Sequence, residues 1–354
     1  MSTQTTQTRP GLRGSDALLE IEDLTVTFGG RGRSTFRAVD GVSFSVRPGE
    51  VVGLVGESGS GKSVTSLAVM GLLPRRGVDV GGQVLFEGRD VLRASPRELA
   101  DLRGRDMAMV FQDPMTSLNP VVPIGTQVTE VLLRHTDLDR SGAREEAEQL
   151  LRRVGIPDPV RRLGEYPHQL SGGMRQRALI AIALACKPKL LIADEPTTAL
   201  DVTIQAQVLE LLRQLVTETG TAMIMITHDL GVVAGLCDQI NVMYAGRIVE
   251  SAERRELFAS PRHRYTAGLL ASIPRMDGAR GEPLRPIPGS PNDTVPWSQA
   301  CAFAPRCEAA DDDCVRPDLP LDTDEVHPGH VARCVHPVPV DGTEPTVPSP
   351  QEHP

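Results

Sequence analysis

The 354-residue sequence predicts an α/β fold, with a largely parallel sheet covered by helices on both faces and an antiparallel β layer added to that sheet. Short apolar runs, typical of strands that are buried on both faces, occur at residues 51–55, 108–111, 190–193 and 222–227. Helical patterns separate these runs, for example at 144–154 and 204–218. Because strands alternate with helices, we expect the strands to be parallel.

The two ends of the chain depart from this pattern. Residues 21–28 and 42–46 alternate apolar and polar positions, which predicts the antiparallel layer. At the other end, residues 274–354 hold 16 of the 29 prolines and four of the six cysteines. We therefore expect a domain boundary near 260–275, followed by a loop-rich segment with little core of its own.

The composition limits the classes of function. Lys and Arg total 37 against 46 Asp and Glu, so the net charge is −9, and this acidic total argues against general binding to nucleic acid. A hydrophobic fraction of 40% is typical of a globular protein. No apolar run reaches the roughly 18 residues of a membrane span, and residues 1–14 lack the apolar core of a secretory signal. We therefore expect a cytoplasmic protein.

A glycine-rich motif lies between the apolar run 51–55 and a helical pattern at 62–73, and it fits G-x-x-x-x-G-K-[ST]. Its residues are Gly56, Glu57, Ser58, Gly59, Ser60, Gly61, Lys62 and Ser63. Glycines allow backbone angles that direct several N–H groups at one anion, and a helix N-terminus adds partial positive charge. The motif predicts a phosphate cradle, in which Lys62 bridges the β- and γ-phosphates and the Ser63 hydroxyl binds Mg²⁺.

Two carboxylates follow the apolar run 190–193. A carboxylate at a strand end beside a phosphate cradle can hold Mg²⁺, usually through water, and Asp194 is expected to do so. Glu195 lies one position further along and is expected to orient and polarise the attacking water. Together with the cradle, these residues predict hydrolysis of a nucleoside triphosphate.

Four further segments make the chain similar to the ABC ATPases. The segment 170–177, LSGGMRQR, resembles their signature sequence, and Gln112 resembles their Q-loop glutamine. The segment 199–201 resembles their D-loop and His228 their switch histidine. All of these segments occur in the family's order within residues 18–260. The resemblance implies an ABC-type P-loop ATPase fold.

The resemblance also assigns residues to the chain's own nucleotide. ATP would contact the eight cradle residues together with Phe28, Val64 and Gln112, where Phe28 resembles the aromatic residue that stacks on adenine and Phe36 lies nearby. Mg²⁺ would be held by Ser63, Gln112 and Asp194. Glu195 and His228 would be catalytic, with His228 contacting the γ-phosphate and holding the geometry at Glu195.

A second nucleotide contact is implied in trans. The signature segment begins a helix but follows no strand, so it offers a second anion-binding helix end, separate from the cradle. In the family, two ATPase chains pair head to tail, and this segment caps the ATP of the partner. The residues assigned to that contact are Ser171, Gly172, Gly173, Gln176 and Asp201. The partner would be a related chain or a second copy.

Three segments narrow the resemblance to the ATP-binding subunits of dipeptide and oligopeptide importers. They are residues 111–120, residues 261–266 and a tail with Pro-rich 287–291 and Cys-rich 301–307; the branch often has Pro where Arg264 stands. The resemblance implies ATP-driven peptide uptake, with two membrane permeases and an extracytoplasmic peptide-binding protein. The chain would then sit at the cytoplasmic face of the cell membrane.

These assignments give an expected domain division. Residues 1–16 would be a flexible tail and residues 17–262 an ABC ATPase domain, with a helical subdomain at about 115–180. Residues 263–336 would form the importer-type C-terminal extension with a four-cysteine site, and residues 337–354 a disordered tail.

The four cysteines of the extension are Cys301, Cys307, Cys314 and Cys334. A disulfide framework is not expected in a reducing compartment, whereas thiolates in a loop-rich segment favour a metal. The resemblance implies a [4Fe–4S] cluster; zinc and unligated thiols are the alternatives, and His327, His330 and His336 are alternative zinc ligands. Cys186 and Cys237 are expected to be core thiols.

Other functions remain as alternatives. Nickel or another small solute is compatible with the same ATPase, because solute choice would lie in other subunits. A DNA-associated ABC ATPase usually inserts a long coiled coil or zinc module between cradle and signature, and no sustained heptads lie between Lys62 and Leu170. A translation-type ABC factor would carry two ATPase cassettes, whereas this chain has one.

Overall fold

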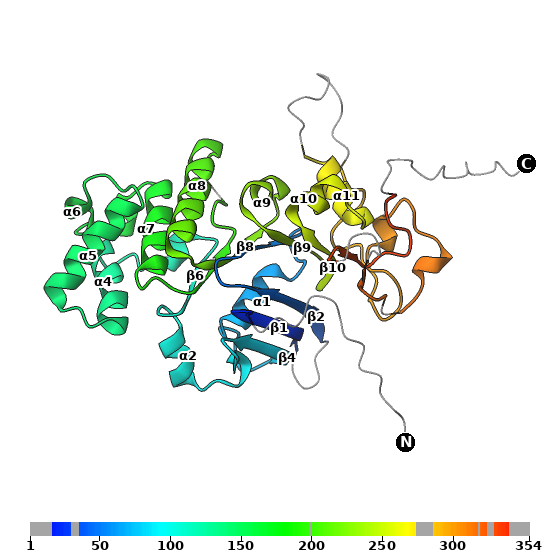
Figure 1. The fold of residues 1–354 in the computed structure, drawn as a ribbon, viewed down its shortest axis with the longest axis horizontal. Coiled ribbons are helices and arrows are strands. Elements are labelled where there is room, and N and C mark those ends of the chain that lie inside the picture. Colours follow the sequence, from blue (N-terminus) through cyan, green and yellow to red (C-terminus); the bar gives the residue numbers. More distant parts are fainter. Residues whose placement is uncertain are drawn as a thin grey trace, which may run out of the picture.

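The computed structural model describes residues 16–29, 35–198, 200–273, 286–317, 319–323 and 329–339. The tails expected at 1–16 and 337–354 therefore lie almost wholly outside the described residues. Figure 1 shows a central group of strands, with helices α4–α7 gathered at one end of the molecule and the C-terminal segment at the other.

The main sheet has eight strands in the order β11-β12-β10-β9-β3-β8-β7-β6. Its parallel part, which confirms the predicted parallel sheet, comprises β9 (Gln239–Tyr244), β3 (Val51–Val55), β8 (Ala222–Thr227), β7 (Leu190–Asp194) and β6 (Met107–Val110). Three strands continue it antiparallel: β10 (Arg247–Glu253), β12 (Val331–Ala332) and β11 (Asp322–Thr323). The apolar pattern of the sequence did not indicate β9, β10 or the two short C-terminal strands.

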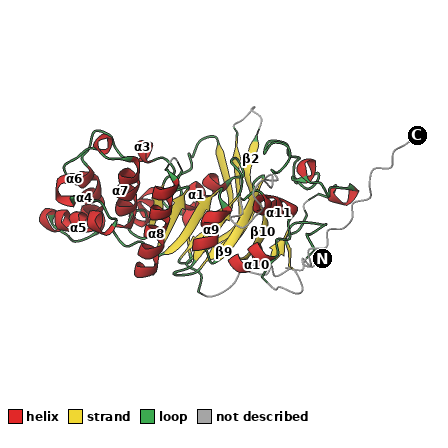
Figure 2. Ribbon diagram, turned by 90° about the horizontal axis from the view of Figure 1, so that it is seen from above, coloured by secondary structure: helices red, strands yellow, loops and turns green. Residues whose placement is uncertain are grey.

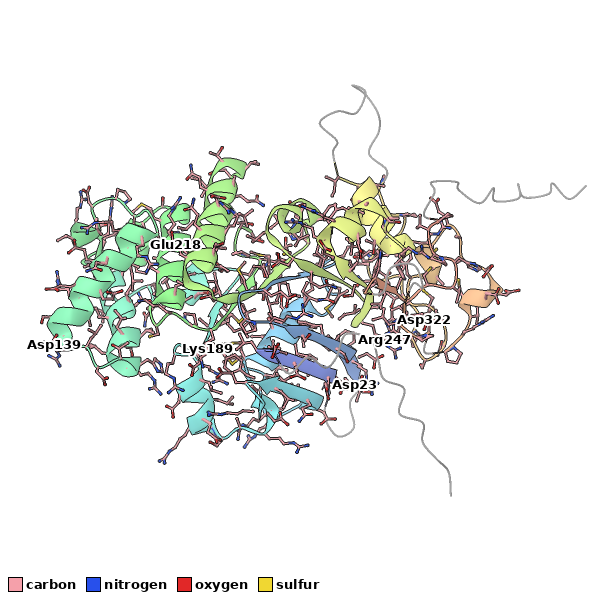
Figure 3. The ribbon with its side chains drawn as sticks, in the orientation of Figure 1. Asp23, Asp139, Lys189, Glu218, Arg247 and Asp322 are labelled. Carbon is pink, nitrogen blue, oxygen red and sulfur yellow. The ribbon has the colours of Figure 1, made fainter. Side chains whose placement is uncertain are left out.

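The expected antiparallel layer is confirmed as a separate sheet of order β2-β1-β4-β5. Its strands are β1 (Leu19–Phe28), β2 (Phe36–Val46), β4 (Val78–Phe86) and β5 (Arg89–Asp90). Helix α1 (Lys62–Val69) lies between this sheet and the main sheet (Figure 1). Lys189, labelled in Figure 3, helps to join the two sheets, because its Nζ lies 2.6 Å from a carboxylate oxygen of Glu87.

The main sheet is covered on both faces, as its apolar strands require. In β3 all five residues are buried, with Val52 and Leu54 in the core shared with the antiparallel sheet. Val51 and Val55 belong to the core on the opposite face, where α8 (Val202–Thr219) and α9 (Leu230–Leu236) pack. Figure 2, seen from above, shows the strands running beneath these helices. Side chains alternate between the faces of a strand, so a buried strand of this kind ties both layers to one scaffold.

A group of helices extends from the β6 end of the main sheet (Figures 1 and 2). It contains α3 (Pro114–Ser117), α4 (Ile124–His135), α5 (Arg140–Arg153), α6 (Pro159–Arg162) and α7 (Gly172–Leu184), while α2 (Pro96–Leu102) lies nearer the antiparallel sheet. Side-chain oxygens of Asp139 and Ser171 cap α5 and α7, which explains where both helices begin. Among the described residues, no helix is both long and apolar enough to cross a membrane.

The C-terminal segment differs from the expected loop-rich unit with little core. After α10 (Arg254–Ala259) and α11 (Arg264–Ala271), its described residues place Trp297, Phe303 and Cys314 in the main hydrophobic core. Strand β12 also pairs with β10, so the segment extends the main sheet. Apolar side chains that are spread through an irregular segment carry no period, which is why the sequence pattern did not reveal this packing.

Candidate functional site

The glycine-rich motif forms a turn between the C-terminal end of β3 and the first residue of α1. Gly56 has a φ of 158°, and a Cβ there would collide with the backbone carbonyl oxygen of Met243. Gly61 has a φ of 105°, and its Cβ would lie 2.6 Å from the Ala38 carbonyl oxygen. Both positions therefore require glycine, and the loop is held in shape by its neighbours.

Lys62 lies at the start of α1 and is only 5% exposed. Its Nζ donates to the carbonyl oxygen of Gly56 at 2.6 Å and to that of Glu57 at 3.0 Å. Burial lowers the pKa of Lys62, while the carboxylates of Glu195, Asp194 and Glu57 act to raise it. The ammonium group is thus folded back into its own loop, in a setting where added negative charge would stabilise it.

The structure brings Ser63 and Asp194 together, although they are 131 positions apart. The Ser63 hydroxyl donates to Oδ1 of Asp194 at 3.1 Å, and the Asp194 residue is 5% exposed. Burial raises the pKa of Asp194, and the nearby Glu195 raises it further, while the Ser63 hydrogen bond opposes the shift. A hydroxyl and a buried carboxylate are oxygen donors of the type that Mg²⁺ prefers, so these two residues fit that ion.

Two of the other predicted residues, Gln112 and His228, meet at the carboxylate of Glu195. Its Oε2 accepts hydrogen bonds from Nε2 of Gln112 and from the Thr198 hydroxyl, both at 2.9 Å. Nδ1 of His228 lies 3.4 Å from the same oxygen. The φ of Glu195 is 47°, a left-handed conformation that costs a non-glycine residue of order 1–3 kcal/mol and is common at functional sites.

Two details of this site differ from the sequence analysis or extend it. Gln112 was expected among the Mg²⁺ ligands, but its amide nitrogen here bonds to Glu195. The contact of Thr198 with Glu195 was not predicted. The sequence feature that could have indicated it is the position of Thr198 three residues after Glu195. The Thr198 N–H donates to the Glu195 carbonyl oxygen at 3.2 Å and closes a turn. The turn places the hydroxyl beside the carboxylate that it caps.

The signature and D-loop segments lie side by side. Ser171 caps α7 by accepting from the Met174 N–H at 3.3 Å, and Asp201 caps α8 by accepting from the Ile204 N–H at 3.0 Å. A Cβ on Gly173 would lie 2.8 Å from Ile204, so glycine permits the two helix starts to approach. Ser171, Gly172 and Asp201 are exposed, and Val202 is 83% exposed; Ala199 lies outside the described residues.

Gln176 does not share this exposed face, contrary to the expectation that it contacts a partner's ATP. Its side chain is buried at 1% exposure, and its Nε2 has no hydrogen-bond partner in the described part of the chain. At 3.6 residues per turn, a residue five positions after Ser171 points about 140° away from it. The geometry of the helix therefore turns Gln176 into the core.

Phe28 and Val64, both expected near ATP, are half-buried and pack against the core beneath the antiparallel sheet. Phe28 ends β1 and pairs in register with Phe36 of β2, which is 65% exposed. The remaining cradle residues occupy the turn itself, with Ser58 and Gly59 exposed and Ser60 buried. Ser60 Oγ has no partner in the described residues.

The four C-terminal cysteines line one cavity of about 10 Å³, together with His336 and Arg264. All are free thiols. Burial, together with the neighbouring thiols of Cys334, Cys314 and Cys307, raises the pKa of Cys301 to about 11. A metal ion binds the thiolate form of cysteine, so a metal that occupied this cavity would have to displace the Cys301 proton.

The other predicted ligands and thiols are distributed differently. His330 is buried and bonds to Glu250, with Nε2 2.7 Å from Oε1, so it is not available to the cysteines; His327 lies outside the described residues. His336 lies at the cavity, where its ring, Asp311 and Cys314 place their ligand atoms within 4.8 Å of one another. Cys237 is buried in the core, as expected, and Cys186 is half-buried.

Comparisons with known proteins agree with this geometry. Residues 39–198 match the ABC transporter family model, and residues 249–314 match the model of the oligopeptide/dipeptide transporter C-terminal region. The chain is 49% identical to the oligopeptide transport ATP-binding protein OppD of Escherichia coli, over 92% of this chain and 94% of that protein. It is also 49% identical to the dipeptide transport ATP-binding protein DppD of Bacillus subtilis, over 90% and 92%.

Solved structures show the same fold. A dimeric, post-hydrolysis ATP-binding cassette bound to ADP and Pi matches with a TM-score of 0.60 and 27% identity, over 67% of this chain and 99% of that one. The Clostridium perfringens structure of cbiO1, part of an ABC transporter complex, matches with a TM-score of 0.58 and 29% identity, over 69% and 91%.

Proposed function

This chain belongs to the ABC transporter family of ATP-binding proteins, in the dipeptide and oligopeptide transport branch, and we propose that it hydrolyses ATP to energise uptake of short peptides across the cytoplasmic membrane. One observation carries the ATPase part: four parallel strands end at one edge, where their following residues meet. The cradle follows β3, Gln112 follows β6, Asp194 ends β7 and His228 follows β8. Ligands of open α/β sheets bind at this carboxyl edge.

ATP would be held by the cradle at the end of β3. Backbone N–H groups of the turn and the start of α1 would contact the phosphates, and Lys62 would move from its two carbonyl partners to the β- and γ-phosphates. Phe28 and Val64 are assigned to the nucleotide by the family resemblance. Ser63 and Asp194 would hold Mg²⁺, which would neutralise negative charge at the phosphates. Gln112 would respond to the presence of Mg²⁺ through its hydrogen bond to Glu195.

Glu195 is the proposed base. Its Oε2 already has two donors and lies beside His228, which fixes the carboxylate in place. Held in this way, the carboxylate would accept a proton from the attacking water as the water oxygen bonds to the γ-phosphorus, while the bond from that phosphorus to the bridging oxygen of the β-phosphate breaks and ADP leaves. His228, which is largely exposed at 61% of its side chain, would contact the γ-phosphate from the solvent side.

A second ATPase chain would complete the site. Ser171, Gly172 and Asp201 are exposed on one face together with the apolar side chain of Val202. An exposed valine flanked by helix starts suits a surface that closes on another protein, and we propose that this face caps the partner's ATP. The partner is a related chain or a second copy.

Permease subunits and an extracytoplasmic peptide-binding protein are the other proposed partners, which places the chain at the cytoplasmic face of the membrane. Exposed apolar side chains near the Q-loop support a permease contact: Met115 is 57% and Val121 78% exposed. Both residues lie in the segment that follows Gln112. A permease helix docked there could therefore shift Gln112 and its contact with Glu195 at the carboxyl edge of the sheet. The proposal includes an ABC ATPase domain at residues 17–262 and an importer-type C-terminal extension at residues 263–336.

The function is tested by co-purification. The full chain, expressed with its membrane partners, is expected to be recovered with two permease chains and a second ATPase chain. After reconstitution, ATP hydrolysis should rise several-fold when a peptide-loaded binding protein is added, because closure of the two ATPases depends on the permeases. Stimulation by DNA, or by nickel but not peptides, would contradict the proposal.

For the cavity lined by Cys301, Cys307, Cys314 and Cys334 we propose a [4Fe–4S] cluster with a structural role. Tetrahedral zinc with bonds of about 2.3 Å would bring four sulfurs to about 3.8 Å from one another. Within the described residues, the one group of three or more ligand atoms lying within 4.8 Å of one another contains a single cysteine, Cys314. Sulfurs that are spread more widely suit a cluster ligated by four cysteines.

Metal analysis tests this cofactor. Anaerobic purification is expected to give about four iron and four sulfide per chain, and Cys301→Ser should lower the iron content strongly. Cys186→Ser is the matched control, because Cys186 lies outside the cavity, and it should leave the iron content unchanged. About one zinc per chain, or no metal at all, would refute the cluster.

A further inference from the structure

Glu57, the second residue of the cradle, is held at three points by the rest of the protein. Its backbone N–H donates to the hydroxyl oxygen of Tyr265 at 2.9 Å. Its carbonyl oxygen accepts from Nζ of Lys62 at 3.0 Å. Its carboxylate receives two bonds from the guanidinium of Arg306, at 2.6 and 3.0 Å. The conformation of this one residue therefore bears directly on Lys62.

Arg306 is built rigidly into its site. Its side chain is 1% exposed, and Nε donates to the Pro288 carbonyl oxygen at 2.9 Å. The guanidinium carbon lies 5.8 Å from the ring centre of Tyr244 and 5.9 Å from that of Phe303. The guanidinium has little freedom to move, because both of its terminal nitrogens are bonded to Glu57. It also packs near two aromatic rings and is largely removed from water.

Both contacts come from the C-terminal part of the chain. Arg306 is 249 positions from Glu57 and lies in the turn Ala304–Arg306, which is flanked by Cys301 and Cys307. Tyr265 lies on α11, and its ring packs 5.4 Å from Phe303 and 4.7 Å from Tyr244. An aromatic cluster thus joins Arg306 and Tyr265 into one unit. We call these two residues the C-terminal clamp.

The charge of Glu57 gives the clamp a consequence for ATP. A carboxylate in a phosphate-binding loop has the same sign as the triphosphate and would oppose its binding. Glu57 carries such a carboxylate, 25% exposed, close enough to act on the pKa of Lys62. The bidentate contact with Arg306 neutralises this charge and draws it towards the aromatic cluster. The cradle then retains the net positive character of its N–H groups and Lys62.

We propose that Arg306 and Tyr265 are positioning residues for ATP: the C-terminal clamp fixes Glu57 and removes its charge from the cradle. The inference rests on the proposed ATPase function and adds a role for the C-terminal segment in nucleotide affinity. The residues of the clamp do not reach the reacting groups at Glu195 among the contacts that the structure describes. Loss of the clamp should therefore weaken ATP binding and leave the chemical step nearly intact.

The test measures ATP dissociation constants for the full chain by calorimetry in EDTA, with KM and kcat from ATPase assays in Mg²⁺. Arg306→Gln is expected to weaken ATP binding about tenfold and to change kcat at saturating ATP by less than about twofold. The double variant Glu57→Gln/Arg306→Gln removes the uncompensated carboxylate as well, and its affinity should return to within about threefold of the wild type.

Arg316→Gln is the matched control, because Arg316 belongs to the same segment but forms an exposed pair with Asp313. It should bind ATP as the wild type does. An unchanged affinity in Arg306→Gln, or a double variant as weak as the single one, would overturn the proposal. If Arg306→Gln does not fold, Arg306→Lys decides: it keeps the charge but loses the bidentate contact, and it must bind ATP measurably more weakly. ATP binding by the wild type tests the ATPase function separately.

Discussion

Glu195→Gln is expected to lower ATP turnover by at least about a hundredfold while ATP binding is retained. The substitution keeps the shape of the side chain but removes the negative charge that would accept a proton from water. Contacts with Gln112, Thr198 and His228 fix the position of the Glu195 side chain. These contacts would hold either a carboxylate or an amide in place. The variant should therefore bind ATP and stop before hydrolysis.

The second readout for this variant is association between ATPase chains. If hydrolysis reopens the pair, a chain that cannot hydrolyse ATP should stay closed, and gel filtration in ATP should show an increased fraction of dimer. Glu148→Gln is a matched control, since Glu148 lies on α5, has a side chain that is 30% exposed, and pairs with Arg152. Turnover close to that of the wild type in Glu195→Gln would remove Glu195 from the role of base.

Sequence reasoning could predict the residues at the carboxyl edge of the main sheet because local rules fix their positions. The cradle needs glycine at Gly56 and Gly61 for steric reasons. This requirement fixes the spacing of the two glycines, which the sequence shows directly. Asp194 follows from the apolar run of β7, since the end of a buried parallel strand determines where its next side chain emerges. The meeting of Gln112 and His228 at Glu195 follows once their strands are placed in one sheet.

The features that the sequence did not reveal are contacts between distant residues, or depend on which face of a helix a residue occupies. The contact between Arg306 and Glu57 joins residues 249 positions apart, and neither lies in a periodic pattern. The strand β12 has two residues, too few to show alternation, yet it pairs with β10. Gln176 lies in a recognised motif, but its rotation on α7 turns it into the core. Such features depend on tertiary packing, which local propensity does not determine.

Lys62→Ala is expected to reduce ATP affinity by at least about a hundredfold, and ATP hydrolysis with it. The ammonium group of Lys62 is buried and bonded to the carbonyl oxygens of Gly56 and Glu57. Exchange of these partners for phosphate oxygens stabilises a charge that burial otherwise disfavours, as the lowered pKa of Lys62 indicates. Alanine supplies neither the charge nor the hydrogen bonds.

Thermal unfolding separates lost binding from lost folding in this variant. ATP that binds the native state raises the melting temperature by an amount that grows with the logarithm of the ratio of ATP concentration to dissociation constant. At an ATP concentration well below the dissociation constant of Lys62→Ala, the wild-type shift should therefore vanish in the variant, while the variant still melts cooperatively. Lys189→Ala is the control, because Lys189 is half-exposed and pairs with Glu87 away from the cradle. It should keep the full shift. A normal ATP-induced shift in Lys62→Ala would mean that the nucleotide is bound elsewhere, because the buried amine at the start of α1 is the one cation that the cradle itself contributes.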